Sequence, residues 1–377
     1  MHLRAGNRAL AAEAVLLSRH VLILADDLTG AADSAAAFLG RSARVTVLLD
    51  AASPPRGGVV AVDLDTRTRP ERAARRIVRH AFSRRAARRA TVLLKKIDST
   101  LRGHVAAELS AVQRALGGSR PVLFAPAFPA QDRRVKDARV FARGRAISGD
   151  LRSLLARAGL PAAHADLATI RSRAPGKALE AALDAGARAL VCDAETDSDL
   201  EALARAGLAL RRRPLFVGSA GLAHALARCL PRSRRARRPA AQPRPVVTVV
   251  GSASPVSVRQ ARRLSRSPVL GPKDLLVQLE WTREPTAADR PVARRLGRLV
   301  AETAPHAHYV LTGGETARAV LGALGVRKFR LLGEVEAGVP YGIAPGGALV
   351  CTKAGAFGNP RTLLHCVARL KREMNRS

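Results

Sequence analysis

The chain has 377 residues, of which 47% are hydrophobic and 3% aromatic, so a sizeable core of alanine, leucine and valine can form. Its formal charge of +34 favours a polyanionic partner. However, the 64 basic residues are mostly arginine and are spread along the whole chain, without an aromatic-rich stretch among them to stack on bases. We therefore attribute the charge to compositional bias and do not expect nucleic acid as a partner. No apolar run approaches the length of a membrane span.

Apolar runs that end in polar or glycine-rich turns alternate with helical patterns through the first 230 residues. Strands are predicted at 21–25, 45–49, 59–63, 91–97, 121–125, 189–193 and 214–217, and helices at 31–39, 70–89, 103–116 and 177–186. This alternation predicts a parallel sheet with helices on both faces. Ligands of such sheets bind beyond the C-terminal ends of the strands. The first twenty residues are expected to be an extension outside the fold.

A proline- and arginine-rich stretch, PRSRRARRPAAQPRP, occupies residues 231–245. Prolines and like charges cannot build a core, so we predict a linker. A second unit then contributes strands at 246–250, 309–312, 330–332 and 348–352. The predicted fold is therefore two Rossmann-like α/β domains with mainly parallel sheets, at 20–230 and 246–377.

The four cysteines lie in apolar settings and form no Cys-x-x-Cys pair. They are expected to be buried free thiols in a reducing cytosol rather than a zinc site. We accordingly predict a cytoplasmic location.

The stretch LILADDLTGAAD (22–33) places Asp26 and Asp27 at the end of a predicted strand, before a turn at Thr29–Gly30 and a helix. Adjacent carboxylates at such a point suit a general base or a metal ligand. The alternative is that one of them caps the helix. We expect at least one to be functional, and expect Asp33 to be solvated or to interact with the helix dipole.

The stretch TVLLKKIDSTLRG (91–103) gathers polar side chains after another predicted strand. They are Lys95, Lys96, Asp98, Ser99, Thr100 and Arg102. Lysine pairs are often plain solvated charges, and a hydroxyl here can cap the next helix. Arg102–Gly103 is predicted to open that helix, whose N-terminus favours anions. The combination suits a substrate that carries a carboxylate. The following loop FAPAFP (124–129), with Arg133 after it, is a weaker candidate for a pocket wall.

The C-terminal unit has three small-residue turns, each after a predicted strand, at Gly251–Ser254, Gly313–Thr316 and Lys353–Gly358. Glycine lets backbone N–H groups approach phosphate closely, and Lys353 can neutralise it. The turns therefore predict a site for a phosphate-bearing ligand. The chain has neither a Gly-x4-Gly-Lys-Ser/Thr motif nor a Gly-x-Gly-x-x-Gly motif after a strand, which argues against a P-loop enzyme and a dinucleotide oxidoreductase.

These motifs together resemble the four-carbon acid sugar kinase family, ATP-dependent kinases of threonate, erythronate and their oxo relatives. The matching segments run in family order over nearly the whole chain: ADDLTGAAD (25–33), KKIDSTLRG (95–103), PAFP (126–129), DAETDSDL (193–200), GSAGLA (218–223), GSASPVS (251–257), TGGETARAVL (312–321), LLGEVEAGVPYG (331–342) and TKAGAFG (352–358). The chain departs from the family pattern after PAFP, where two glycines and a threonine are replaced within 131–138.

The resemblance implies that the N-terminal domain binds the acid sugar and the C-terminal domain binds ATP. Asp26, Asp27 and Asp98 become candidates for the group that orients or deprotonates the hydroxyl, and Mg²⁺ is expected on the phosphates, with Asp27 and Glu315 as possible ligands. The residues expected to face the acid are Lys95, Lys96, Ser99, Arg102 and Arg133. Those expected at the nucleotide are Ser252, Ser254, Gly313, Gly314, Glu315, Thr316, Lys353, Gly355 and Gly358.

Two alternatives stay open: a family member that binds ligand without catalysis and, less favoured, a basic nucleic-acid-binding protein. The sequence also leaves open whether the chain forms a homodimer and which sugar acid it takes.

Overall fold

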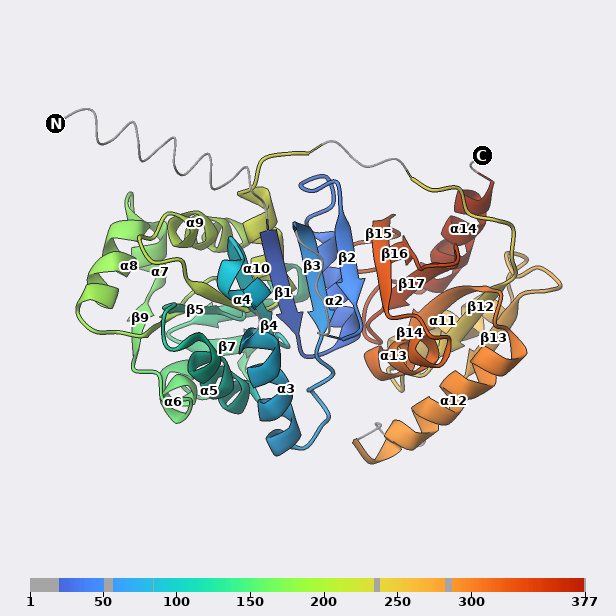
Figure 1. Ribbon diagram of the computed structural model, residues 1–377, viewed down its shortest axis with the longest axis horizontal. Helices are drawn as coiled ribbons and strands as arrows, with labels where there is room; N and C mark the ends of the chain where they lie inside the picture. The colour runs from blue at the N-terminus through green and yellow to red at the C-terminus, as the bar shows by residue number, and fades with distance from the viewer. Residues whose placement is uncertain (1–19, 51–56, 84, 234–237, 282–286, 376–377) are drawn as a thin grey trace.

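The computed structural model describes residues 20–50, 57–83, 85–233, 238–281 and 287–375 (Figure 1). One sheet of fourteen strands runs through both halves of this part of the chain, in the order β13-β12-β14-β17-β16-β15-β2-β3-β1-β4-β11-β5-β10-β9. The predicted α/β class is confirmed. The two expected sheets are, however, joined edge to edge.

The N-terminal half contributes eight strands that all pair in parallel, and two groups of helices flank them. The strands are β1 (His20–Ala25), β2 (Val45–Leu48), β3 (Gly58–Asp63), β4 (Val92–Lys96), β5 (Val122–Ala125), β9 (Ala162–Ala165), β10 (Ala189–Cys192) and β11 (Leu215–Gly218). The helices are α2 (Leu28–Ala36), α3 (Glu71–Ser83), α4 (Arg85–Arg89), α5 (Val105–Leu116), α6 (Leu151–Arg157), α7 (Leu167–Arg171), α8 (Pro175–Asp184), α9 (Asp197–Leu208) and α10 (Ala220–Arg228).

The C-terminal half contributes the other six strands of the sheet and four α-helices. They are β12 (Val246–Val250), α11 (Pro255–Ser265), β13 (Leu275–Gln278), α12 (Arg290–Thr303), β14 (His308–Thr312), α13 (Gly314–Ala323), β15 (Lys328–Glu334), β16 (Pro340–Ile343), β17 (Leu349–Lys353) and α14 (Thr362–Met374). β12, β13, β14 and β17 pair in parallel, whereas β15 and β16 are antiparallel to their neighbours.

The halves meet where β15 pairs with β2 in antiparallel register, Phe329 opposite Val47. Without β15, β2 would be an open edge of the N-terminal sheet. Helix α2 lies at this junction and contacts α13, β15, β16 and β17 as well as its own half. All nine of its residues are buried, because both halves cover it.

The eleven predicted strands coincide with observed strands to within two residues at each end. Three strands of the large sheet were not predicted: β9 reads AAHA, β16 starts at a proline, and β13 is a short, partly exposed edge strand that reads LLVQ. Around the predicted linker, the described residues 231–233 and 238–245 form neither helix nor strand, and 234–237 lie outside the described residues. The predicted N-terminal extension (1–19) also lies outside them.

The segment that departs from the family pattern forms a small antiparallel sheet of β6 (Arg133–Lys136), β7 (Arg139–Ala142) and β8 (Arg145–Ala146), after a short 3₁₀ turn at Pro129–Gln131. Two of the positions at which the family has glycine adopt the left-handed conformation, with φ of 53° at Asp132 and 55° at Ala138. The backbone N–H of Ala138 donates to Asp193 Oδ1 at 3.1 Å. This part of the chain therefore keeps a backbone that glycine would adopt without strain.

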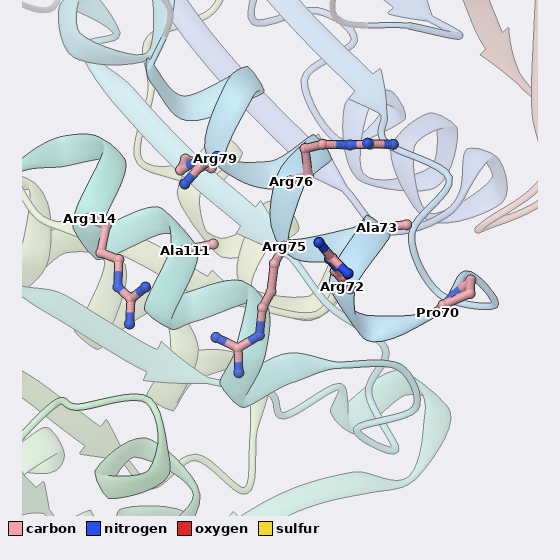
Figure 2. A pocket seen from close by; sticks show the side chains of 8 residues that line it. All are labelled: Pro70, Arg72, Ala73, Arg75, Arg76, Arg79, Ala111 and Arg114. Atoms are coloured by element: carbon pink, nitrogen blue, oxygen red, sulfur yellow. The ribbon is translucent and has the colours of Figure 1, made fainter.

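Part of the positive charge gathers between two helices. A hollow of about 580 Å³ between α3 and α5 is lined by five arginines, together with Pro70, Ala73 and Ala111 (Figure 2). The arginines are Arg72, Arg75, Arg76, Arg79 and Arg114. No helix in the described parts of the chain is both long enough and apolar enough to cross a membrane.

Candidate functional site

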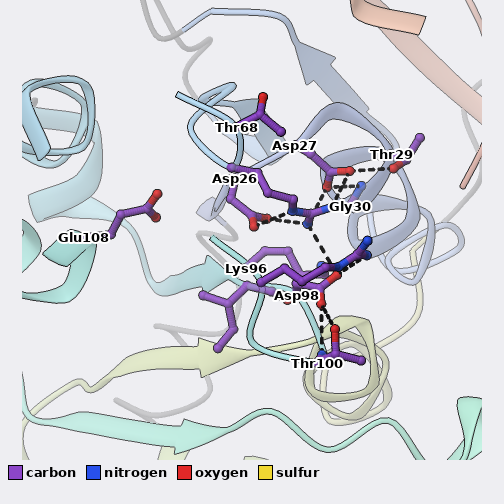
Figure 3. Close-up of polar contacts among 12 residues, drawn as sticks. Asp26, Asp27, Thr29, Gly30, Thr68, Lys96, Asp98, Thr100 and Glu108 are labelled. Atoms are coloured by element: carbon purple, nitrogen blue, oxygen red, sulfur yellow. Dashed lines mark hydrogen bonds and ion pairs between the residues drawn. The ribbon is translucent and has the colours of Figure 1, made fainter. Parts of the chain in front are cut away.

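Three strand ends of the N-terminal half bring the polar motifs together. β1 lies between β3 and β4, and Ala25 is in register with Asp63 on one side and Lys96 on the other. The loops that follow these strands therefore leave the sheet side by side. This places the ADDLTGAAD and KKIDSTLRG motifs at one edge, as predicted, with the loop 64–70 beside them (Figure 3).

Asp27 is the N-cap of α2. Its Oδ1 accepts the N–H of Gly30 at 2.9 Å, and its Oδ2 accepts the hydroxyl of Thr29 at 2.7 Å. The helix thus begins at Leu28, earlier than the predicted Ala31, because Asp27 caps it and Gly30 lies in its first turn instead of in a preceding bend. The side chain of Asp26 takes no part in this cap and is almost fully buried, with 3% of its surface exposed.

Arg67 contacts the carboxylates of Asp26, Asp27 and Asp98, which we call the carboxylate cluster (Figure 3). Its Nε and Nη2 donate to the two oxygens of Asp26, both at 2.8 Å. Nη2 also donates to Asp27 Oδ1 at 2.9 Å, and lies 3.9 Å from Asp98 Oδ1. Burial works against ionisation of Asp26, but the charges of Arg67 and Lys95 outweigh it and lower the pKa of that carboxyl. One guanidinium consequently holds the ionised Asp26 and also contacts Asp27 and Asp98.

Asp98 is held by its own loop. Its Oδ1 accepts Arg102 Nη2 at 2.7 Å, and its Oδ2 accepts the N–H of Thr100 at 3.0 Å and the Thr100 hydroxyl. Burial raises the pKa of Asp98, but these hydrogen bonds and the charge of Arg67 bring it well below its ordinary value. The loop includes Leu101 at φ 64°, a strained conformation for a bulky residue.

The loop continues beyond the point at which a helix was predicted. Arg102 and Gly103 belong to it, and α5 begins only at Val105, after His104. The prediction that they open a helix is therefore wrong, because Asp98 ties Thr100 and Arg102 back into the turn. Ser99 lies half-buried in the same loop.

The two neighbouring lysines lie in different environments. Lys95 is fully buried, and its Nζ is 2.7 Å from Glu108 Oε2 on α5. The ammonium of Lys96 donates to the carbonyl of Ile97 at 2.9 Å and lies against Gly30 in the first turn of α2, beside Asp27. Among the described residues it forms no ion pair with a carboxylate, so it retains donors for an anionic ligand.

The N-terminus of α13 in the C-terminal half reaches this cluster. A Cβ on Gly314, the first residue of α13, would lie 2.9 Å from Asp27 Oδ2 and 3.4 Å from Thr29 Oγ1. Gly313 before it has φ 96°. Because the first backbone N–H groups of a helix have no partner within the helix, α13 presents donors next to Asp27.

The small-residue turns of the C-terminal half converge. A Cβ on Gly251 would overlap the hydroxyl of Thr316, and one on Gly355 would overlap that of Ser252. Ser252 Oγ also accepts the N–H of Ser254 at 3.2 Å. The turns after β12, β14 and β17 thus share one region, and larger side chains are excluded from it. Such a cradle of glycines, hydroxyls and a helix N-terminus suits nucleotide phosphates.

Lys353 does not face open space. It is fully buried, and its ammonium donates to the carbonyls of Ala354, Gly355 and Phe357 at 2.9, 3.1 and 3.2 Å. Burial lowers the pKa of Lys353 to about 8. The lysine therefore holds the turn that contains Gly355, and Gly358 (φ 86°) ends this turn against Thr362.

Protein groups engage the side chains of Glu315 and Arg133, two other predicted site residues. Glu315 accepts the hydroxyl of Thr68, and its Oε2 is 3.4 Å from Arg290 Nε. Arg133 donates to the carbonyl of Gln131 and pairs through its backbone with Phe128. The Phe128 ring lies 6.5 Å from that of Phe357, so the PAFP loop touches the TKAGAFG loop across the halves.

The sequence reasoning missed Arg67 and misjudged Asp33. Arg67 lies in DLDTRTRP (63–70), a run of polar residues after a correctly predicted strand, and this signal could have revealed it. Asp33 is 5% exposed, which contradicts the expected solvated position. Burial and the charge of Glu334, opposed by Lys96, raise the pKa of Asp33 to about 7. Its position could not be foreseen, because the C-terminal half covers α2.

Comparison with known proteins finds two family matches along the chain. Residues 21–226 match a family described as a sugar-binding N-terminal domain, and residues 272–363 match one described as a nucleotide-binding C-terminal domain. A D-threonate kinase of Cupriavidus necator is 38% identical, over 91% of this chain and 96% of its own. The chain belongs to the four-carbon acid sugar kinase family. This membership confirms the function class predicted from the motifs.

Other relatives of the family carry related names. A D-threonate kinase of Bordetella bronchiseptica is 31% identical over 93% of this chain and 98% of its own, and a 3-oxo-tetronate kinase of Methylobacterium radiotolerans is 28% identical over 89% and 95%. A crystal structure from Salmonella typhimurium, described as a putative tRNA synthase, has a TM-score of 0.74, with 21% identity over 92% of this chain and 98% of that one. That likeness supports the fold.

Proposed function

We propose that the chain transfers the γ-phosphoryl group of ATP to a hydroxyl of threonate or a close four-carbon sugar acid. Residues 20–230 bind the acid and residues 246–377 bind the nucleotide. The observation that carries this proposal is the approach of Gly314, at the N-terminus of α13, to Asp27 in the carboxylate cluster. It brings a phosphate-binding helix end and a hydroxyl-binding carboxylate within reach of one reacting group.

Lys96 and Arg102 are the cations that bind the carboxylate of the acid. Lys96 has donors left, and 69% of the Arg102 side chain is exposed. A charge-assisted hydrogen bond of this kind contributes roughly 1.5–3 kcal/mol. Lys95, paired with Glu108, supports the loop that carries Lys96 and Arg102. Ser99 and Arg133 are the remaining residues that we assign to the binding site of the acid.

The acceptor hydroxyl binds to the aspartates held by Arg67. Asp98 accepts hydrogen bonds from Thr100 and Arg102 and serves to position these two residues. Asp27 lies closest to the helix end at which the transferred phosphoryl group would bind, so we assign to Asp27 the acceptance of the hydroxyl proton, with Asp26 orienting the hydroxyl. Phosphoryl transfer depends mainly on positioning and charge neutralisation, and a weak base at this place is sufficient.

The cradle of Gly251, Ser252, Gly313, Thr316 and Gly355 suits the triphosphate, because glycine lets backbone N–H groups approach phosphate closely and the hydroxyls of Thr316 and Ser252 lie beside Gly251 and Gly355. Mg²⁺ usually takes one or two carboxylates, substrate phosphates and water, and Asp27 is the carboxylate nearest the cradle. When bound, Mg²⁺ would neutralise charge on the phosphates. Glu315, whose carboxylate Thr68 and Arg290 engage, is the second candidate ligand beside the cradle.

The first experiment measures ADP release with Mg-ATP over D- and L-threonate, D- and L-erythronate and their oxo forms. We expect turnover on at least one acid, and a loss of roughly 10- to 100-fold in kcat/KM for that acid in Lys96→Ala, from the charge-assisted bond removed. Folded protein that binds ATP but turns over none of the acids would contradict the proposal. It would favour a family member that binds ligand without catalysis.

A further inference from the structure

A set of ion pairs crosses between the halves beside the carboxylate cluster. From the N-terminal half come Asp63 and Asp65 at the end of β3, and Thr68 after them. From the C-terminal half come Arg290, the first residue of α12, and Glu315 and Arg318 in α13. We call these six residues the latch.

The contacts within the latch are direct. Arg318 donates to the carboxylate of Asp63, and its Nε lies 3.3 Å from Asp65 Oδ2. Arg290 Nη2 donates to both oxygens of Asp65, at 2.6 and 2.5 Å. On the other side of the loop the hydroxyl of Thr68 donates to Glu315. Each end of the segment 63–68 is thus held by the nucleotide half.

The two aspartates are buried, with 1% of Asp63 and 6% of Asp65 exposed. A buried carboxylate needs a partner, and Asp63 finds its cationic partner in the other half of the chain. Burial raises the pKa of Asp63 to about 7, against the lowering effect of Arg318. Asp65 has φ 52°, a conformation that costs energy unless its surroundings hold it. Arg69 of the same half also donates to the carbonyl and the carboxylate of Asp65, so the loop 63–68 is held from both halves, and the C-terminal half supplies the cation for Asp63.

Arg67 lies inside this loop, between Asp65 and Thr68. Its side chain holds Asp26 and Asp27 in the cluster, whereas its backbone N–H donates to the carbonyl of Asp26 at 3.2 Å. A loop that is fixed on both sides of Arg67 by Arg290, Arg318 and Glu315 therefore fixes the guanidinium as well.

We propose that Arg290 and Arg318 are positioning residues, which place Arg67 on the carboxylates of the acceptor site when the nucleotide half lies against the loop 63–68. The acceptor site is then completed by the half that carries ATP. Gly30 and Thr29 orient Asp27 within the N-terminal half. The closed arrangement adds the fixed guanidinium of Arg67 on Asp26 and Asp27. This couples hydroxyl activation to the presence of the nucleotide domain. This inference rests on the proposed kinase function.

The test compares Arg318→Gln with Arg327→Gln. Arg327 also crosses between the halves, with Nη1 3.2 Å from Asp50 Oδ2, but it is not one of the six latch residues and its side chain is 84% exposed. Amide hydrogen exchange of residues 64–70 is measured first. We expect exchange at least tenfold faster in Arg318→Gln, and within twofold of the wild-type rate in Arg327→Gln.

Steady-state kinetics give the second readout. In Arg318→Gln we expect kcat/KM for the sugar acid to fall at least tenfold while the KM for ATP stays within threefold, and Arg318→Lys to recover part of the loss because it keeps the charge. A role in general stability alone would not separate the two substrates in this way. If Arg318→Gln does not fold, Arg290→Gln takes its place.

Unchanged exchange in the loop 64–70, or equal kinetic losses in Arg318→Gln and Arg327→Gln, would overturn the inference. A wild-type protein that phosphorylates none of the acids would instead overturn the proposed function. The exchange experiment would still decide in that case whether the nucleotide half holds the loop.

Discussion

The two halves of the molecule build their parts of the candidate site from different chemical groups. The N-terminal half uses charged side chains: three aspartates, Arg67, and Lys96 beside them. The C-terminal half uses glycines, hydroxyls and backbone N–H groups, and its Lys353 is turned inward to hold a loop. Lysines at similar strand ends therefore have different functions, and their hydrogen-bond partners distinguish them better than their positions in the motifs.

Under the proposed function, the difference follows from the two ligands. A small sugar acid offers one carboxylate and several hydroxyls, so charged groups at fixed positions must distinguish it. A triphosphate offers many oxygens along a chain, which backbone N–H groups can bind once no Cβ stands in the way. The predictions below test this comparison, from the largest expected effect to the smallest.

Asp27→Asn removes the carboxylate that faces both halves. We expect kcat to fall about 10²–10⁴-fold, which is the range for loss of a proton acceptor, with little change in the melting temperature because asparagine still caps α2. Asp184→Asn, at a carboxylate that is 61% exposed on α8, is the matched control and should keep wild-type turnover. Wild-type turnover in Asp27→Asn would refute the role of this carboxylate.

Gly251→Ala tests the cradle of the C-terminal half. The added methyl would overlap Thr316, so we expect the KM for ATP to rise roughly tenfold, equivalent to about 1.4 kcal/mol, with the KM for the sugar acid nearly unchanged. Gly322→Ala is the control, because nothing lies within 4 Å of its Cβ position. That substitution should stabilise α13 by about 0.5 kcal/mol and leave the KM for ATP unchanged. An equal rise in both variants would contradict the cradle.

Lys353→Met and Lys96→Met directly compare the lysines that end β17 and β4. Lys353→Met leaves several carbonyls without a donor, and we expect it to lower the free energy of unfolding by about 1–3 kcal/mol. Lys96→Met should instead raise the KM for the sugar acid with a smaller change in stability. Denaturant unfolding and kinetics on both variants check this. The reverse outcome would exchange the two assignments.

Ala138→Gly tests the altered segment after the PAFP loop. Ala138 has φ 55°, and a left-handed conformation costs an L-residue roughly 1–2 kcal/mol, part of which glycine recovers. We expect a gain in stability of up to about 1 kcal/mol, measured by denaturant unfolding, with turnover unchanged. A loss of stability would show that the methyl group of Ala138 contributes packing that outweighs the strain.

Much of the fold could be predicted because its strands are short apolar runs with clear ends, such as VLILA and VVTVV. The positions of Asp26, Asp27, Lys96 and Asp98 followed from the rule that ligands bind beyond the ends of parallel strands. The roles of Lys95 and Lys353 could not be predicted, because a buried lysine and a ligand-binding lysine look the same in sequence. Only the contacts with Glu108 and with the carbonyls of the 354–357 turn distinguish them.

What the sequence could not predict lies mostly between the halves. The burial of Asp33, the pairing of β2 with β15, and the latch all depend on how distant segments meet. Asp63 and Arg318 are separated by 255 positions in the chain, and no local pattern relates them. Arg67 is an exception, since its motif was visible and lay after a predicted strand.

The antiparallel pairing of β2 with β15 also bears on how the chain can be divided for expression. A fragment that ends at residue 230 would leave β2 without β15 and so expose its edge. The complementary fragment would expose the corresponding edge of β15. Unpaired edges of this type recruit strands from other molecules. The proline-rich segment is thus a poor place to separate the protein, and a soluble N-terminal fragment would need charged or proline substitutions along β2.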